Sequence, residues 1–315
     1  MLHSLVESAA SLGVNAVKFQ VHIADAESSD LEPFRVKFSY QDTSRYQYWK
    51  RMEFNISDWE VIKKKCDDLG VEFLATPFST AAVDLLEKIN VKRYKIGSGD
   101  ASNLLLLEKI AKTKKEVMIS SGLGTLDELD KSVSIFRNGN IPFTILQCTT
   151  KYPTTSSDIG LEWIGILKDR YKCPVGFSDH SGTIYPCLGA VTLGAEVIEA
   201  HITFDKRMFG PDSKASLNVD EFKKMMEGIR FLETAKGKGS DNKSSKNKTE
   251  LRRMFGRAIG VNKNLLVGHK IKFEDLEIKK PADAGIPVND YKNIIGMELV
   301  ANKKAWEFLN YKDLQ

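Results

Sequence analysis

Short apolar runs rich in β-branched residues alternate with longer, helix-like runs over the first 235 residues of the chain. Seven such runs are predicted to be strands: 14–20, 71–75, 91–96, 116–120, 143–148, 174–178 and 196–203. The segments between them repeat apolar residues at helical spacing, as Trp59, Ile62, Cys66 and Leu69 do. Strands that alternate with helices predict a parallel sheet with helical crossovers.

Local signals at helix ends support this division. The stretch Ser57-Asp58-Trp59-Glu60 predicts a capping box, and Thr125-Leu126-Asp127-Glu128 predicts another. The chain opens with an amphipathic helix whose apolar face runs from Leu2 to Leu12, and Gly13 suits its end. A helix therefore precedes the first predicted strand.

Seven strands and a leading helix fit a (β/α)₈ TIM barrel that lacks its first strand, which would lie before Met1. The alternative is a doubly wound open sheet. No glycine-rich G-x-G-x-x-G loop follows an early strand, which weakens that alternative. We therefore expect a barrel of the α/β class.

The composition of the chain changes at its C-terminal end. Residues 1–235 form the predicted barrel domain, and residues 236–250 contain only Lys, Gly, Ser, Asp, Asn, Thr and Glu. Such a segment predicts a solvated linker, with a patch for an anionic ligand as the alternative. Residues 251–315 form a second, small β-rich unit that contains Pro281, Gly285 and Pro287.

Composition and charge exclude several classes of protein. With 315 residues, 42% hydrophobic and 28% charged, the chain is typical of a folded globular protein. A net charge of +4 is too small for a general nucleic-acid binder. No apolar stretch approaches the ~20 residues of a membrane span, and the N-terminus lacks a signal-peptide pattern. Four scattered cysteines predict a reducing cytoplasm: Cys66, Cys148, Cys173 and Cys187.

Polar side chains gather where the predicted strands end. In a parallel barrel these ends form one rim, which is where catalysis takes place. The rim residues are Lys18, Gln20, Thr76, Lys95, Ser98, Asp100, Ser120, Ser121, Thr149, Thr150, Ser178, Asp179, His180, Glu199 and His201. Lysines, hydroxyls and nearby glycines predict a site for a phosphate or phosphate-carboxylate substrate. The alternative for each lysine is a solvated strand end.

Two histidines end successive strands of this rim. The neutral imidazoles of His180 and His201 could bind a divalent metal ion, with water and substrate completing its coordination. Asp179 and Glu199 are close enough in sequence to be further ligands or hydrogen-bond partners. The alternative is two strand-capping histidines without a metal. The remaining histidines are expected on the surface: His3, His22 and His269.

Several motifs, in order along the chain, resemble the N-acetylneuraminate (sialic acid) synthase family. They are Ala16-Val17-Lys18-Phe19-Gln20, Ala75-Thr76-Pro77-Phe78, Tyr94-Lys95-Ile96-Gly97-Ser98-Gly99-Asp100, Cys148-Thr149-Thr150-Lys151-Tyr152-Pro153, Gly176-Phe177-Ser178-Asp179-His180, Glu199-Ala200-His201-Ile202-Thr203 and Gly210-Pro211-Asp212. The second unit, with Arg257-Ala258-Ile259 and Ile278-Lys279-Lys280-Pro281, resembles the family's antifreeze-like SAF domain.

The resemblance implies a condensation of phosphoenolpyruvate with the open-chain aldehyde of an N-acyl hexosamine, either N-acetylmannosamine or a diacetamido analogue. It implies that Mn²⁺ or Mg²⁺ is held by His180 and His201, which act with Lys95 in catalysis. It assigns phosphoenolpyruvate to Lys18, Thr76, Lys95, Ser98, Ser120, Thr150 and Ser178, and the sugar to Gln20, Tyr152, Asp212 and Lys280. It also implies a domain-swapped homodimer.

Four features depart from the family pattern. The family's first strand, with a Glu-Ile-Gly…Asn-His segment, would lie before Met1, so its proton-handling glutamate is expected to be missing and turnover impaired. Lys280 stands where the family usually has arginine, whose planar fork lysine cannot reproduce. Asp100 stands where some members have glutamate, and Thr150 where some have asparagine.

Other functions remain open from the sequence. One is another phosphoenolpyruvate-condensing enzyme, of the pseudaminate or octulosonate type. A metal-dependent hydrolase would also use histidines on a barrel rim, although it normally needs more than two. The alternative from a different class is a non-catalytic sugar-phosphate binding protein.

Overall fold

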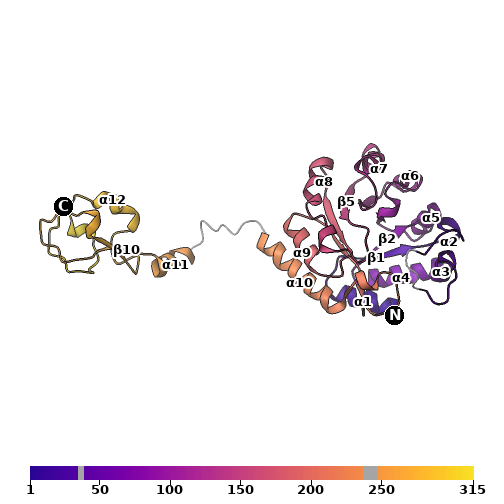
Figure 1. Ribbon diagram of the computed structural model, residues 1–315, viewed down its shortest axis with the longest axis horizontal. Coiled ribbons are helices and arrows are strands. Elements are labelled where there is room, and N and C mark those ends of the chain that lie inside the picture. The colour runs from indigo at the N-terminus through magenta and orange to yellow at the C-terminus, as the bar shows by residue number, and fades with distance from the viewer. Residues whose placement is uncertain (35–38, 237–246) are drawn as a thin grey trace. The chain divides into compact units, whose positions relative to one another are not determined.

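The computed structural model describes residues 1–34, 39–236 and 247–315. The chain divides into two compact units, Met1–Lys236 and Gly237–Gln315 (Figure 1). Each unit has its own hydrophobic core. No helix in the described ranges is long and apolar enough to cross a membrane.

The first unit is built on a curled sheet of seven parallel strands (Figure 1). The strands are β1 (Ala16–Val21), β2 (Glu72–Pro77), β3 (Arg93–Ile96), β4 (Glu116–Ser120), β5 (Phe143–Cys148), β6 (Val175–Asp179) and β7 (Ile198–Ala200). Each strand pairs with its neighbour in the sequence, from β1 to β7. A doubly wound sheet reverses its strand order at a switch point, so this order rules out that alternative. That a further strand completes the barrel stays a prediction.

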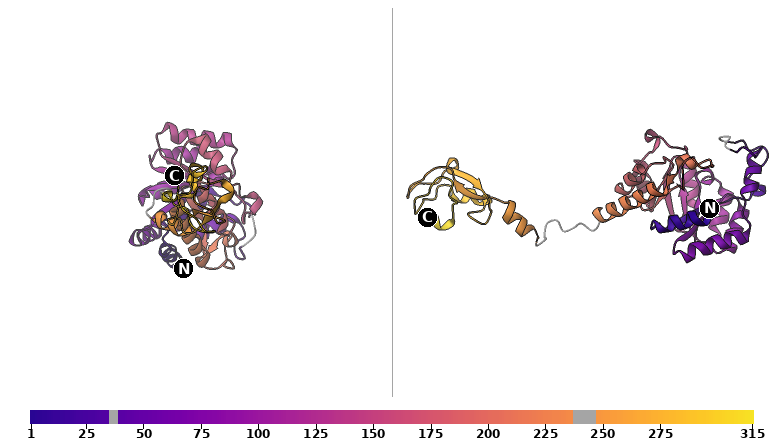
Figure 2. Two further views of the ribbon diagram at one scale, coloured as in Figure 1. Left: turned by 90° about the vertical axis from the view of Figure 1, so that its left-hand side faces the viewer. Right: turned by 90° about the horizontal axis from the view of Figure 1, so that it is seen from below.

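Helices lie along the outside of the curled sheet (Figures 1 and 2). They are α1 (Leu2–Ser11), α2 (Ala24–Glu27), α3 (Arg45–Met52), α4 (Ile56–Asp68), α5 (Thr80–Lys88), α6 (Leu104–Ala111), α7 (Leu126–Asn138), α8 (Trp163–Tyr171), α9 (Tyr185–Thr192) and α10 (Val219–Lys236). The leading helix and the capping box of Thr125 and Glu128 are confirmed. The predicted box at Ser57 is wrong, because Asn55 caps α4 and forms the box with Asp58.

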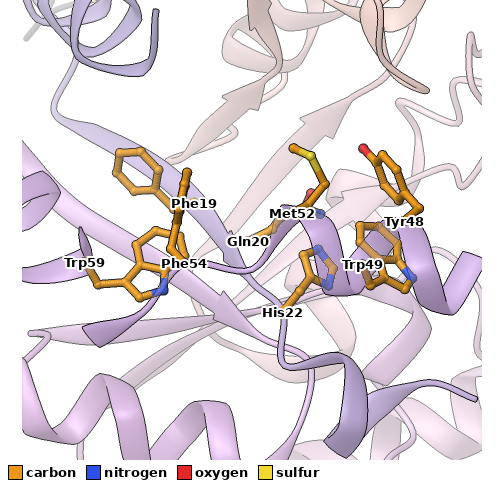
Figure 3. Close-up of a pocket in the computed structure, with 8 residues that line it drawn as sticks. All are labelled: Phe19, Gln20, His22, Tyr48, Trp49, Met52, Phe54 and Trp59. Atoms are coloured by element: carbon orange, nitrogen blue, oxygen red, sulfur yellow. The ribbon is translucent and has the colours of Figure 1, made fainter. Parts of the chain in front are cut away.

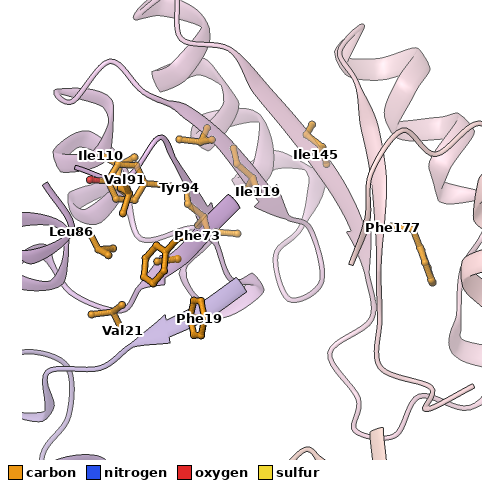
Figure 4. Close-up of a cluster of buried hydrophobic side chains, with 14 of the residues drawn as sticks. Phe19, Val21, Phe73, Leu86, Val91, Tyr94, Ile110, Ile119, Ile145 and Phe177 are labelled. Carbon is orange, nitrogen blue, oxygen red and sulfur yellow. The ribbon is translucent and has the colours of Figure 1, made fainter. Parts of the chain in front are cut away.

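The alternation of side chains along each strand separates the core from the site. Phe19, Phe73 and Ile119 belong to the large core cluster, which also includes helix residues such as Leu86 and Ile110 (Figure 4). Residues at the intervening positions belong to the inner face, where Leu74, Met118 and Leu146 make a small apolar layer. Because successive strand residues face opposite sides, the polar residues beyond this layer share the interior end of the barrel.

The predicted strand 196–203 is interrupted. β7 ends at Ala200, and a separate short strand, β8 (Ile202–Thr203), pairs in parallel with β9 (Leu217–Asn218). His201 lies between the two strands, and its backbone carbonyl accepts a hydrogen bond from the N–H of Leu217. This break positions His201 at the end of the barrel sheet.

The second unit contains α11 (Asn247–Phe255), β10 (Ala258–Val261), β11 (Leu276–Lys279) and α12 (Tyr291–Ile294). β10 and β11 form an antiparallel pair over a core that includes Ile259, Val261 and Leu309. Most of the predicted linker, residues 237–246, lies outside the described residues. The residues of this segment that the structure describes are helical, because Lys236 is the last residue of α10 and residues 247–250 begin α11. That this unit is an SAF domain stays a prediction.

Candidate active site

A polar pocket opens at the carboxyl ends of the barrel strands, where the sequence placed the rim. Its lining residues are Lys18, Gln20, Thr76, Phe78, Lys95, Gly97, Ser98, Ser120, Cys148, Tyr152, Ser178, His180, Glu199, His201 and Asp212. The pocket has about 390 Å³ of empty space, part of it open to solvent. Eleven of the predicted site residues are thus brought together from five strands, β1 to β4 and β6, and from the segments that follow β3, β5, β6, β7 and the short strand β8.

Two lysines meet on one buried carboxylate in this pocket. Lys18 Nζ lies 3.8 Å from Glu199 Oε2, and Lys95 Nζ lies 3.4 Å from Glu199 Oε1. Burial alone would raise the pKa of Glu199, but the charges of Lys18 and Lys95 outweigh it and hold this pKa well below its ordinary value. Burial lowers the pKa of Lys95, while Glu199 opposes that shift. Two cations share one anion here, so this lysine cluster carries a net positive charge, and Asp212 is the other carboxylate in the pocket lining.

Hydroxyl groups surround the ionic centre. Ser178 Oγ donates to Glu199 Oε1 at 2.7 Å, and Lys95 Nζ donates to Ser120 Oγ at 2.7 Å. Thr76 Oγ1 is buried without a hydrogen-bond partner among the described residues. A buried hydroxyl normally has a partner, and an anionic ligand between the two lysines would supply one. The pocket therefore has the charge and the donors of an anion site.

Thr150 joins the site through its neighbours. Its Oγ1 lies 2.8 Å from Ser98 Oγ, although Thr150 itself is not among the pocket-lining residues. Gly122 leaves room for this side chain, because a Cβ there would lie 2.6 Å from Thr150 Oγ1 and 2.9 Å from the carbonyl oxygen of Cys148. Any larger residue at position 122 would displace Thr150 and the end of β5.

The two predicted metal ligands lie side by side. The ring centroids of His180 and His201 are 5.2 Å apart, and those of Tyr152 and His180 are 4.3 Å apart. Burial lowers the pKa of His180 to about 3 and that of His201 to about 4, so both rings are neutral at physiological pH. His180 Nδ1 lies 3.2 Å from the backbone oxygen of Thr149. A proton on Nδ1 leaves the Nε2 lone pair available for a metal ion.

The donor set fits a metal ion that also needs other ligands. In the described residues, no group of three or more His, Cys, Asp or Glu side chains is arranged around a common point. Glu199 faces the lysines, and Asp179 accepts a hydrogen bond from Ser181 Oγ at 2.8 Å. His180 and His201 would therefore supply two ligands, and water and substrate would supply the rest.

A comparison with models of known protein families shows which family the chain belongs to. The model of the NeuB family matches residues 5–241, which is most of the chain. The chain belongs to the NeuB family.

Relatives of this NeuB-family chain extend over both units. It is 35% identical to the N,N'-diacetyllegionaminic acid synthase of Campylobacter jejuni, over 97% of this chain and 92% of the relative. It is 32% identical to the pseudaminic acid synthase of the same species, over 98% and 91%. Among solved structures, the N-acetylneuraminic acid synthetase of Leptospira borgpetersenii in complex with citrate has a TM-score of 0.70 at 29% identity, covering 80% of this chain and 84% of that chain.

Two residues with predicted roles, Asp100 on the rim and Lys280 at the sugar, lie outside the pocket lining. Four further rim residues also lie outside it: Ser121, Thr149, Thr150 and Asp179. Asp100 is hydrogen-bonded by Asn103 Nδ2 at 3.0 Å, and burial raises the pKa of its carboxyl. Lys280 belongs to the second unit, where its Nζ lies 5.4 Å from the centroid of the Phe255 ring. The polar pocket of the first unit is thus formed without Asp100 and Lys280.

Sequence reasoning missed part of the site. Cys148 lines the pocket and was interpreted only as a thiol of a reducing compartment. His22 was expected on the surface, but its side chain is only 10% exposed and its Nδ1 lies 2.6 Å from Glu27 Oε1. His269 was also expected to be a plain surface residue, yet it bonds to the buried Asp275. Strand alternation could have indicated Cys148, whereas no local signal marks His22.

Proposed function

We propose that the polar pocket joins phosphoenolpyruvate to the open-chain aldehyde of an N-acyl hexosamine and releases a nonulosonic acid and phosphate. The observation that carries this proposal is the pairing of Lys18 and Lys95 on Glu199, next to two neutral histidines. The lysine end suits a small dianion or trianion, and the histidine end suits a metal-bound carbonyl oxygen. Relatives named as nonulosonic acid synthases support the same reaction class.

The lysine end would hold phosphoenolpyruvate. Lys18 and Lys95 would bind its phosphate and carboxylate, and the unpartnered Thr76 hydroxyl would donate to one of their oxygens. Further hydroxyls surround this position: Ser98, Ser120, Thr150 and Ser178. In the empty pocket, the Glu199 carboxylate holds the two lysine ammonium groups in position. When phosphoenolpyruvate binds, these ammonium groups would turn from Glu199 to the substrate.

The histidine end would hold the aldehyde of the sugar. His180 and His201 would bind Mn²⁺ or Mg²⁺, and that ion would polarise the carbonyl. Tyr152 packs against His180, and Gln20 and Asp212 line the same pocket. These three residues would orient the sugar so that its carbonyl carbon faces C3 of phosphoenolpyruvate. A new bond then joins C3 to that carbon, water adds at C2, and phosphate leaves.

The second unit would complete the site in a dimer. We infer that it is an SAF domain, that two chains exchange these domains, and that Lys280 reaches the sugar bound to the partner's barrel. Lys280 replaces an arginine, so the sugar would be contacted by one ammonium group and not by the planar set of donors of a guanidinium. The four cysteines are all free thiols, which supports a cytoplasmic location. Light scattering tests the dimer, and a monomer would contradict it.

The reaction is tested by phosphate release. Purified full-length protein is incubated with phosphoenolpyruvate, Mn²⁺ and either N-acetylmannosamine or a diacetamido analogue. We expect phosphate release that needs both the sugar and the metal ion, and a loss of release in Lys95→Met. A binding protein without catalysis would bind phosphoenolpyruvate but release no phosphate with either sugar, which would overturn the proposal.

A further inference from the structure

Two loops carry residues of the histidine end of the polar pocket. His180 lies in residues 180–184, between β6 and α9, which we call the His180 loop. Asp212 lies in residues 204–216, between the short strands β8 and β9, which we call the Asp212 loop. Because β8 pairs with β9 and the carbonyl of His201 bonds to the start of β9, both ends of the Asp212 loop are fixed. The part between them needs other contacts to hold it in one place.

One lysine connects the two loops. Lys206, near the start of the Asp212 loop, donates from Nζ to the carbonyl oxygen of Gly182 in the His180 loop, at 2.8 Å. The same ammonium group donates to Glu221 Oε1, also at 2.8 Å. Glu221 is itself fixed in the first turn of α10, where its Oε2 accepts a hydrogen bond from the N–H of Asn218 at 2.9 Å. Lys206 thus joins both loops to α10.

The two loops also touch where no side chain could fit between them. Gly182 has a φ of +68°, a backbone conformation that favours glycine. A Cβ at position 182 would lie 2.6 Å from the backbone oxygen of Lys214, which belongs to the Asp212 loop. The His180 loop is therefore in contact with residues on both sides of Asp212 in the sequence.

The His180 loop has a firm base of its own. Asp179, the last residue of β6, accepts a hydrogen bond from Ser181 Oγ at 2.8 Å. Ser181 Oγ in turn accepts a hydrogen bond from the N–H of Thr183 at 3.1 Å. These bonds fix the turn to the end of the strand, so the Gly182 carbonyl is a defined point of attachment for Lys206.

On another side the Asp212 loop comes near α3. Tyr48 of α3 lines a second pocket together with Trp49 and Met52 (Figure 3). Burial raises the pKa of Tyr48, and the negative charge of Asp212 adds to this shift, so the two residues are close in space. The position of the Asp212 loop therefore affects what surrounds Tyr48 as well as the polar pocket.

We propose that Lys206 is a positioning residue for the acceptor sugar: it holds the Asp212 loop against the His180 loop and so fixes Asp212 relative to His180. This inference rests on the proposed function, which takes the sugar to lie at these two residues. Lys206 is not among the pocket-lining residues, so it acts through the loops and does not touch the substrate. Lys18 and Lys95, which would hold phosphoenolpyruvate, come from β1 and β3 and not from either loop.

The chemistry of the bridge favours a lysine. An ammonium group has three donors and can bond to a carbonyl oxygen and a carboxylate at the same time. The side chains of Lys206 and Glu221 are 32% and 36% exposed, so solvent screens their ion pair, which contributes little to overall stability. Loss of the bridge should therefore release the loop without unfolding the domain.

Amide hydrogen exchange on the full chain tests the bridge itself. Lys206→Met keeps the aliphatic stem and removes both bonds, so exchange in residues 204–216 should become about tenfold faster, as for the loss of a charge-assisted hydrogen bond. Lys206→Arg keeps a cation with several donors and should restore most of the slow exchange. Lys168→Met is the matched control, because it breaks an exposed lysine–glutamate pair with Glu196, at 3.2 Å, away from both loops.

Steady-state kinetics tests the consequence for the sugar. Lys206→Met should raise the KM for the sugar and lower its kcat/KM by ~10²-fold, the cost of a small misplacement near the reacting atoms. The dissociation constant for phosphoenolpyruvate, measured by calorimetry, should stay unchanged. Gly182→Ala should give the same split between the two substrates, because its Cβ would push the Lys214 backbone away. Lys206→Arg should recover most of the kcat/KM.

The outcomes separate the inference from the proposed function. Unchanged exchange in Lys206→Met would overturn the inference, and so would faster exchange with an unchanged kcat/KM for the sugar; the proposed function would stand in both cases. An equal loss of affinity for sugar and phosphoenolpyruvate would give Lys206 a general structural role and would also overturn it. No phosphate release from the natural protein would contradict the proposed function, while the bridge between the loops would stand or fall on the exchange result alone.

Discussion

Lys95 and Glu199 form an ion pair inside the barrel, with 3.4 Å between Nζ and Oε1. Their side chains are only 3% and 15% exposed. Lys95 comes from the end of β3 and Glu199 from β7, so the pair spans the interior of the curled sheet. A buried lysine is costly unless a carboxylate balances it, and this pair keeps a cation ready where the pocket needs one.

Loss of the carboxylate should destabilise the empty protein. Glu199→Gln keeps the shape but leaves Lys18 and Lys95 without their counter-ion, which we expect to lower the free energy of unfolding by about 3 kcal/mol. Phosphoenolpyruvate would then supply the missing negative charge. Thermal unfolding should show a larger stabilisation by this ligand in the variant than in the natural protein. A smaller stabilisation in the variant would contradict this view. It would mean that Glu199 helps to bind phosphoenolpyruvate and is not merely the counter-ion of the lysines in the empty pocket.

Loss of either lysine should weaken phosphoenolpyruvate binding. Lys18→Met and Lys95→Met keep the aliphatic stem and remove the charge, so affinity should fall by ~1.5–3 kcal/mol, as for hydrogen bonds between charged groups. Titration calorimetry measures the change. Lys151→Met is the matched control, because Lys151 is paired with Asp158 outside the pocket lining. Unchanged affinity in both pocket variants would locate the anion site elsewhere.

Loss of either histidine should abolish metal binding. His180→Gln and His201→Gln fill much of the same volume, which limits the damage to packing around the buried ring of His180. Electron paramagnetic resonance titration with Mn²⁺ should show binding in the natural protein and in the exposed control His3→Gln, and none in the two pocket variants. Tight Mn²⁺ binding that survives both substitutions contradicts the assignment.

The second unit should lose stability in acid through one carboxylate. Asp275 is 1% exposed. Burial raises the pKa of its carboxyl, but hydrogen bonds from Lys263, His269 and the N–H of Lys272 outweigh it and lower the pKa to about 2. Because the folded pKa lies below the ordinary 3.8, the stabilisation is complete above about pH 5 and is lost as the pH falls toward 2. This difference between the folded and the ordinary pKa of Asp275 corresponds to about 2 kcal/mol in the free energy of unfolding.

Hydrogen exchange at the amides of β10 and β11 in the full chain tests this effect. Asp275→Asn should speed exchange at neutral pH and remove most of the further loss between pH 5 and pH 2. Asp283→Asn is the control, because Asp283 is half-exposed and paired with Arg253 at the surface. Equal acid sensitivity of Asp275→Asn and the natural protein would show that another group controls the transition.

The rim of the barrel could be predicted because it follows from local rules. Strand periodicity assigns Lys18 and Gln20 to one side of β1, opposite Phe19, and the parallel order of the strands brings all such ends together. The same alternation indicates Lys95 on β3. The positions of these residues therefore depend on neighbours in the sequence and on a regular sheet.

The surroundings of His22 could not be predicted, because they depend on contacts between distant segments. The burial of His22 depends on the packing of α3 against the end of β1, and the stacked rings Trp49 and Phe78 lie 27 and 56 positions away in sequence. The ion pairs of Glu199 with Lys18 and Lys95 likewise join residues far apart in the chain. Capping at Asn55 was missed for a different reason, since Ser57 offers an equally plausible cap two residues later.

Formation of the carbon–carbon bond is the central claim, and ¹³C NMR tests it most directly. Phosphoenolpyruvate labelled at C3 is followed with Mn²⁺ and the diacetamido sugar. We predict that the vinyl CH₂ signal is replaced by a saturated CH₂ bonded to a carbon from the sugar, with one phosphate released for each bond formed. A label that remains in phosphoenolpyruvate, or that appears in the methyl group of pyruvate, would contradict the account.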